Sequence, residues 1–88
     1  MNQAGDFTIQ NGRLERYAGH DAEVVIPDSV NRIYRNAFAG CKELEKVVIP
    51  DSVSTIDEYA FAGCAKLEEV VIPDSVNMID RYVFAACA

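Results

Sequence analysis

Hydrophobic residues occur along the chain in short alternating runs that are separated by turn-forming residues. The same arrangement occurs three times, because the segment VVIPDSV begins at Val24, Val47 and Val70. Each copy continues with an isoleucine, a phenylalanine and a cysteine at matching positions, so the repeat length is 23 residues. Such self-similarity predicts a stack of equivalent structural units.

Each unit is expected to begin with a β-strand, which spans residues 44–50 in the second copy. Val47 and Ile49 would share one face of that strand and Val48 the other, since side chains alternate with a period of two. Pro50 has no N–H to donate and ends the strand. The following Asp and Ser favour a turn.

The rest of the unit is expected to return the chain to the next strand. Residues 53–56 would run extended along the opposite side, and Asp57 would cap a helical turn over residues 58–62. The residues expected to point inward are Leu44, Val47, Ile49, Val53, Ile56, Ala60, Phe61 and Cys64. One unit cannot bury this set alone, so the units are expected to stack as a solenoid.

The first 23 residues differ from the repeats. Asn11-Gly12 lies between two alternating runs, 7–10 and 13–17, which is a strong signal for a β-hairpin. Solenoids need an atypical terminal unit to cover the first hydrophobic face. We therefore expect one domain over residues 1–88, with an N-terminal hairpin cap at 1–23 and three repeats at 24–88, the last of them incomplete.

The repeat combines a strand pattern of Leu44, Val47 and Ile49 with the segments IPDSV and AFAGC. This pattern resembles the BspA-like leucine-rich repeat family over residues 24–88. The family often has glycine where this chain has Tyr34, Asp57 and Asp80, and the last unit has Val83 and Ala86 in place of Ala and Gly. The resemblance implies an α/β repeat solenoid, right-handed, with a parallel strand ladder, in a bacterial cell-surface or extracellular protein that mediates adhesion.

Composition narrows the possible partners. The chain has 88 residues, of which 50% are hydrophobic, and a net charge of −6. An acidic chain without clustered basic residues does not favour nucleic acid or an anionic membrane surface. No apolar run approaches bilayer-spanning length, and residues 1–6 lack a signal-peptide pattern.

The candidate binding face lies on the outward side of the predicted strands. Val25, Val48 and Val71 would form an apolar stripe there, bordered by Glu23, Lys46 and Glu69. A contiguous apolar stripe with a charged rim is typical of a protein-binding surface. The alternative is that valine is present only because it favours strands.

Other repeated side chains favour structural roles. The Asp28, Asp51 and Asp74 column could hold a cation, but local hydrogen bonding to turn amides is the preferred interpretation. The cysteines Cys41, Cys64 and Cys87 are expected to stack as free thiols, although neighbouring rungs lie within disulfide reach. Tyr59 and Tyr82 are expected on the outer surface, and His20 in a solvated loop.

No catalytic constellation, cofactor motif or metal-ligand spacing is recognisable in the sequence. The serines of the repeat have no histidine at a matching spacing, so no catalytic triad is indicated. We therefore predict a non-enzymatic protein-binding module, with a structural spacer as the alternative. Self-association through the uncapped C-terminal end, around residues 70–72 and Phe84, is also expected.

Overall fold

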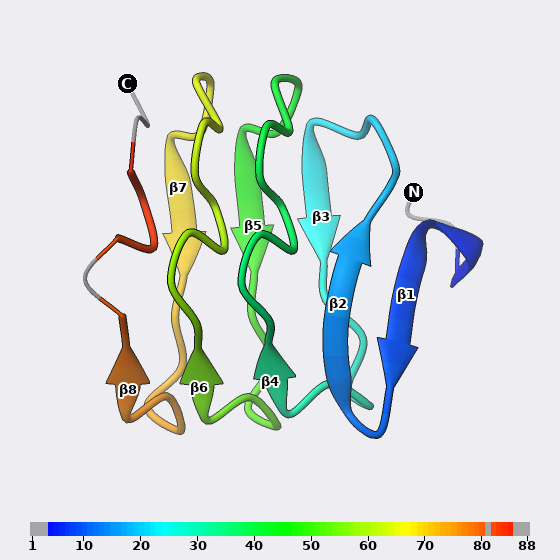
Figure 1. Ribbon diagram of the computed structural model, residues 1–88, viewed down its shortest axis with the longest axis vertical. Helices are drawn as coiled ribbons and strands as arrows, with labels where there is room; N and C mark the ends of the chain where they lie inside the picture. The colour runs from blue at the N-terminus through cyan, green and yellow to red at the C-terminus, as the bar shows by residue number, and fades with distance from the viewer. Residues whose placement is uncertain (1–3, 81, 86–88) are drawn as a thin grey trace.

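The computed structural model describes residues 4–80 and 82–85, and their strands form two sheets (Figure 1). A short 3-10 helix, Ala4–Asp6, comes first. The strands are β1 Phe7–Gln10, β2 Arg13–Tyr17, β3 Glu23–Val25, β4 Arg32–Ile33, β5 Lys46–Val48, β6 Thr55–Ile56, β7 Glu69–Val71 and β8 Met78–Ile79. We call the three successive units rung 1 (residues 24–46), rung 2 (47–69) and rung 3 (from 70).

The first strands of the rungs form a three-stranded parallel ladder in the order β3-β5-β7. Val24 pairs with Val47, and Val47 pairs with Val70, so the three valines occupy successive rungs as expected. Strand β5 covers only Lys46–Val48, so it is shorter than the predicted strand 44–50.

A second ladder, β1-β2-β4-β6-β8, runs along the opposite side of the molecule. Ile33 pairs with Ile56, and Ile56 with Ile79, in parallel register. The extended course of residues 53–56 was expected, but its participation in a sheet was not. Both ladders therefore hold each rung to its neighbour.

The core lies between the two ladders. All eight residues expected to point inward, Leu44 at the end of rung 1 and seven residues of rung 2, are buried. A column of stacked rings runs through this core from Tyr17 to Phe38, Phe61 and Phe84, with centroid separations of 5.2, 4.9 and 5.7 Å. Each phenylalanine thus supports the corresponding residue of the next rung.

The predicted helical turn over residues 58–62 is wrong, and with it the α part of the expected α/β class. Within the described residues the structure contains no α-helix, and this segment is a series of tight turns. Tyr59 has a φ of 60°, which a right-handed helix does not allow. In addition, the Phe61 and Gly63 amides donate to Val83 and Ala85 on rung 3, so they form no helical hydrogen bonds.

The N-terminal hairpin joins the second ladder. Asn11 and Gly12 both have positive φ, 54° and 78°, as a two-residue hairpin turn requires. Strand β2 pairs antiparallel with β1 and parallel with β4, and Leu14 lies opposite Ile33. The hairpin strand therefore continues the ladder of the repeats.

Tyr17 ends the hairpin at the start of the ring column. Its hydroxyl donates a hydrogen bond of 2.8 Å to Asp21, which fixes the loop that leads to rung 1. Burial, followed by the hydrogen bond to Asp21, raises the pKa of Tyr17 to about 12. The phenol therefore stays protonated and remains a donor throughout the physiological pH range.

Candidate functional site

The valine stripe lies on the outward side of the β3-β5-β7 ladder, as expected. Val25 and Val71 are 55% and 41% exposed, and Val48 between them is partly exposed. Val24 and Val47, their neighbours on the same strands, are completely buried. The alternation of the strand therefore separates the core from the candidate face.

The charged residues beside the stripe interact with one another. The Lys46 ammonium lies 3.9 Å from a Glu23 carboxylate oxygen, and Lys46 is paired in register with Glu69. This alternation of Glu, Lys and Glu places opposite charges next to each other on neighbouring strands, which is favourable. The column thus has a stabilising role in addition to bordering the stripe.

A shallow groove connects the valine stripe to the aspartate column. It has a volume of about 540 Å³ and lies across rungs 1 and 2. Its lining comprises Val25, Ile26, Asp28, Val48, Ile49, Pro50, Asp51 and Ser52. Two features that the sequence analysis treated separately therefore belong to one surface, which is apolar at the strands and acidic at the turns.

The aspartates do not bond to turn amides, so the preferred interpretation of their role was wrong. Among the described residues, the carboxylates of Asp28, Asp51 and Asp74 form no hydrogen bond or ion pair. The turns close instead through backbone hydrogen bonds, such as the one from the Val53 amide to the Pro50 carbonyl at 3.1 Å. The column is therefore a line of solvent-facing negative charges.

The serines of the repeat have a role that the sequence analysis missed. Ser52 donates a 2.6 Å hydrogen bond to the Val30 carbonyl, and Ser75 donates a 2.8 Å bond to the Val53 carbonyl. Each hydroxyl thus links its turn to the preceding rung. The recurrence of the serine at one repeat position was the available signal.

No metal site is recognisable in the part of the chain that the structure describes. Over residues 4–80 and 82–85, no group of three or more His, Cys, Asp or Glu side chains is arranged to hold an ion. A calcium ion needs about 6–8 oxygen ligands. The aspartate column offers one carboxylate from each rung, which does not provide such a shell.

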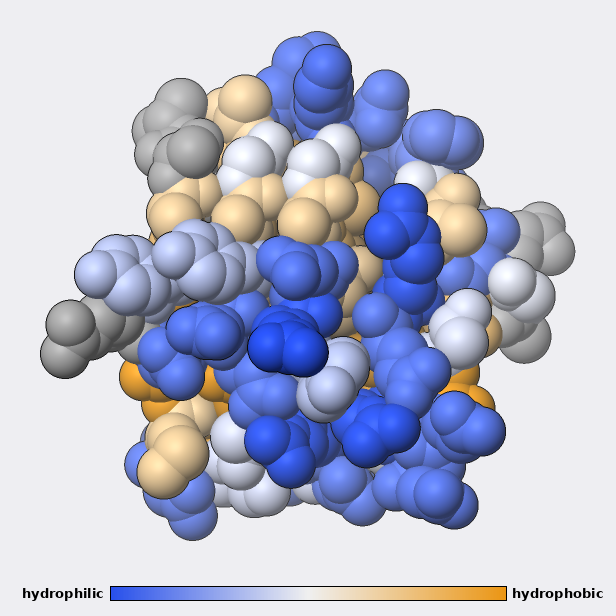
Figure 2. All heavy atoms as spheres, viewed as in Figure 1, coloured by the Kyte–Doolittle hydropathy of each residue, from blue (hydrophilic) through white to orange (hydrophobic). Residues whose placement is uncertain are grey.

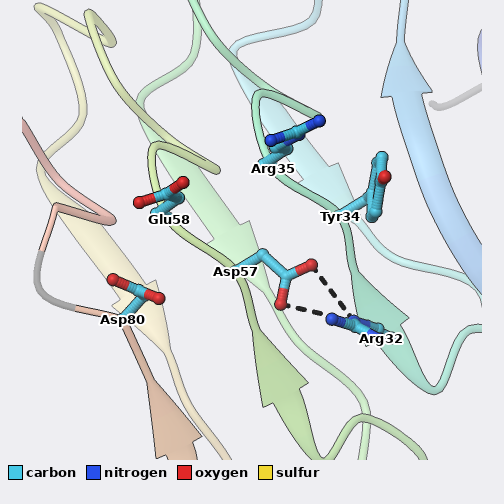
Figure 3. A pocket seen from close by; sticks show the side chains of 6 residues that line it. All are labelled: Arg32, Tyr34, Arg35, Asp57, Glu58 and Asp80. Atoms are coloured by element: carbon cyan, nitrogen blue, oxygen red, sulfur yellow. Dashed lines mark hydrogen bonds and ion pairs between the residues drawn. The ribbon is translucent and has the colours of Figure 1, made fainter.

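A second hollow lies on the face that carries β4, β6 and β8, where hydrophilic side chains cover most of the centre (Figure 2). Its volume is about 420 Å³, and its lining comprises Arg32, Tyr34, Arg35, Asp57, Glu58 and Asp80. Arg32 reaches across to Asp57 on rung 2 and donates from Nε to both carboxylate oxygens, at 3.1 and 3.3 Å (Figure 3). Basic and acidic groups of this hollow therefore already pair across the rungs.

Tyr59, Tyr82 and His20 lie outside the core. Tyr59 and Tyr82 are exposed, as expected, and their rings stack at 5.4 Å. His20 is exposed in its loop, but its Nδ1 lies 3.6 Å from a Glu43 carboxylate oxygen. That contact was missed because it joins the hairpin loop to rung 1.

The cysteines of rungs 1 and 2 are free thiols. Cys64 is fully buried, whereas Cys41 is partly exposed. Cys87 of the expected stack and Ala86 of the altered last unit lie outside the described residues.

No helix in the described residues is both long enough and apolar enough to cross a bilayer.

Curated proteins give no sequence match to this chain. Solved structures do match. The T. pallidum leucine-rich repeat protein shares 30% identity with a TM-score of 0.89, over 97% of this chain and 45% of that one. A leucine-rich repeat protein from Bacteroides ovatus shares 36% identity with a TM-score of 0.71, over 92% of this chain and 24% of that one.

A third similar structure is a leucine rich cell surface protein from Faecalibacterium prausnitzii, with 24% identity and a TM-score of 0.57. It matches over 91% of this chain and 30% of its own length. The chain thus spans less than half the length of each of these proteins. Residues 17–88 match the sequence profile described as BspA type leucine rich repeat region (6 copies). The repeats, the parallel ladder and this match together show that the chain belongs to the BspA type leucine-rich repeat family.

Proposed function

We propose that this leucine-rich repeat module binds a protein partner through the valine stripe and the adjoining groove, and acts by binding rather than by catalysis. The observation that carries the proposal is the combination of exposed valines with a groove that ends in unpaired carboxylates. A contiguous apolar surface with a polar rim is what protein interfaces require. The competing function is a structural spacer, which needs the fold but not this surface.

The proposed setting is the bacterial cell surface or the extracellular space, with a role in adhesion. The family resemblance supports this setting. The Faecalibacterium prausnitzii structure is described as a cell surface protein, but at 24% identity its likeness supports the fold alone. We further propose that residues 1–23 serve as the N-terminal cap of a right-handed solenoid whose repeats occupy residues 24–88.

The double substitution Val48→Lys/Val71→Lys tests the binding role. Both side chains point outward, so the fold should be kept, while two charges in the stripe should weaken binding at least about tenfold, or roughly 1.4 kcal/mol. The measurement is biolayer interferometry of the folded chain against a panel of extracellular matrix proteins, with circular dichroism to verify folding.

The matched control for this test is Thr8→Lys/Ala65→Lys, which adds the same charge at exposed positions outside the groove. Binding proteins of the panel should retain their affinity for this control. Equal affinity of both variants and the parent chain, or no binding by the parent, would favour the spacer.

A second candidate role is self-association through rung 3. Six of the eight large hydrophobic residues that are exposed in the described chain lie between residues 71 and 84, namely Val71, Ile72, Met78, Ile79, Tyr82 and Phe84. An open strand edge beside exposed apolar groups promotes pairing with a second copy. Sedimentation velocity over a range of concentrations should therefore show dimers, and Ile79→Lys should reduce them. A monomer at every concentration would refute this role.

A further inference from the structure

Cys41 and Cys64 occupy the same position in adjacent rungs, and the backbone brings them together. The Gly40 amide donates to the Ala62 carbonyl at 2.8 Å, which joins the two turns just before the cysteines. The amide of Cys41 and the thiol of Cys64 both donate to the Phe38 carbonyl, at 3.2 and 3.1 Å. The Cys64 thiol and the Cys41 backbone therefore meet at the same carbonyl oxygen.

Only one of the two thiols is open to solvent. A pocket of about 120 Å³ lies between the hairpin loop and rung 1, and Cys41 lines it. Arg16, Tyr17, His20 and Glu43 also line this pocket. Cys64, in contrast, is fully buried and does not line this pocket. A small polar molecule could therefore reach the first sulfur but not the second.

The surroundings of Cys41 favour its reactive thiolate. The interaction with the Cys64 side chain is the largest cause that lowers the pKa of Cys41, and the positive charge of Arg16 adds to it. Burial and the Glu43 carboxylate act in the opposite direction. His20 lies against that carboxylate at 3.6 Å. A partly exposed thiol beside a cation and a second cysteine is the arrangement found in oxidation-sensitive sites.

We propose that Cys41 and Cys64 form a redox-active pair that a small hydroperoxide oxidises through the pocket. The Cys41 thiolate attacks one peroxide oxygen, so an S–O bond forms and the O–O bond breaks. The other oxygen takes up a proton and leaves as water, or as an alcohol. The Cys64 thiol then attacks the Cys41 sulfenic acid, forms the disulfide and releases the sulfenic oxygen as water.

The rung spacing allows this disulfide without unwinding the fold. The neighbouring Phe38 and Phe61 rings are 4.9 Å apart, close to the spacing of about 4.8 Å between paired strands. Disulfides join Cα atoms that are roughly 4.4–6.8 Å apart. The bond would tie rung 1 to rung 2 covalently, so the oxidised chain should melt at a higher temperature than the reduced chain.

The test uses the full chain with Cys87→Ser, so that only this pair remains. Hydrogen peroxide should remove two hydrogens from the intact mass, and peptide mapping should find Cys41 joined to Cys64. Dithiothreitol should reverse the change. Addition of Cys64→Ser should instead yield a sulfenic acid on Cys41 that dimedone traps, whereas Cys41→Ser should leave the folded protein unmodified.

A second measurement distinguishes a Cys41 thiol of lowered pKa from two neighbouring thiols of ordinary reactivity. The alkylation rate of Cys41 by iodoacetamide should rise at a lower pH than for an ordinary thiol of pKa about 8.5. Arg16→Gln should move that midpoint upward, while the matched Arg13→Gln should not. Unfolding in urea should make the alkylation rates of Cys41 and Cys64 equal.

Several results would overturn the proposal. These are a folded protein that resists peroxide, oxidation of Cys64 before Cys41, or a disulfide that forms only with Cys87 when all three cysteines are present. Loss of partner binding in the Val48→Lys/Val71→Lys variant would leave this inference unaffected, because the pocket lies apart from the valine stripe.

Discussion

Phe61→Ala is expected to lower the free energy of unfolding by about 3–5 kcal/mol. The ring is completely buried and lies between two other rings, at 4.9 Å from Phe38 and 5.7 Å from Phe84. Its removal leaves a cavity in the middle of the column, and adjacent rungs cannot collapse into it because the two ladders fix their spacing. The loss should therefore lie at the upper end for a core phenylalanine.

Urea denaturation followed by circular dichroism gives the measurement. Phe84→Ala is the matched control, since this ring belongs to the same column but is 38% exposed and has only one stacking partner among the described residues. Phe84→Ala should lower the free energy of unfolding by clearly less than Phe61→Ala does. An unchanged melting temperature for Phe61→Ala would contradict the central position of the ring.

Val47→Lys is expected to prevent folding, with a cost of about 5 kcal/mol or more. Val47 is fully buried, and the described core contains no buried polar or charged side chain that could pair with an ammonium group. Val48→Lys on the same strand should cost less than about 1 kcal/mol, as surface substitutions usually do. The two variants differ only in the side of the strand that receives the charge.

Circular dichroism and amide hydrogen exchange distinguish these outcomes. The Val48 variant should keep the protected amides of the ladder, while the Val47 variant should lose them. If both variants fold equally well, or if the order is reversed, the assignment of inner and outer faces is incorrect. The binding measurements on the Val48→Lys/Val71→Lys variant are informative only if the Val48 variant keeps its fold.

The sequence predicted the parts of the fold that depend on repetition and on strand alternation. The identical VVIPDSV segments fix the register of the first ladder, and the period of two correctly separates Val47 from Val48. The second ladder was missed because β4, β6 and β8 each contain only two residues. Two residues carry no alternating pattern, so their pairing depends on the stacking of complete rungs.

The error at residues 58–62 has a local cause. A tyrosine gives no sign that its backbone will adopt a φ of 60°, since glycine and asparagine are the usual residues there. Asn36, at the same position of rung 1 and with a φ of 61°, was the available indication. Comparison of the rungs position by position would have favoured a turn over a helix.

The candidate site was predicted only in part. The stripe of Val25, Val48 and Val71 follows from strand alternation, but the groove that joins it to the aspartates depends on how the turns pack. The pocket beside Cys41 could not be predicted, since it forms where the end of β2 and the loop that follows it lie against rung 1. Contacts between a unique segment and a repeat leave no periodic signal.

The uniform register of the ladders bears on how such chains change length. Strand β3 pairs with β5 as β5 pairs with β7, and in both cases the partners are 23 positions apart. A gene segment that encodes one rung could therefore be duplicated or lost while every junction between neighbours keeps the same partners. Evolution could therefore lengthen or shorten the outward valine surface by one complete rung at a time, and no new interface between rungs would be needed.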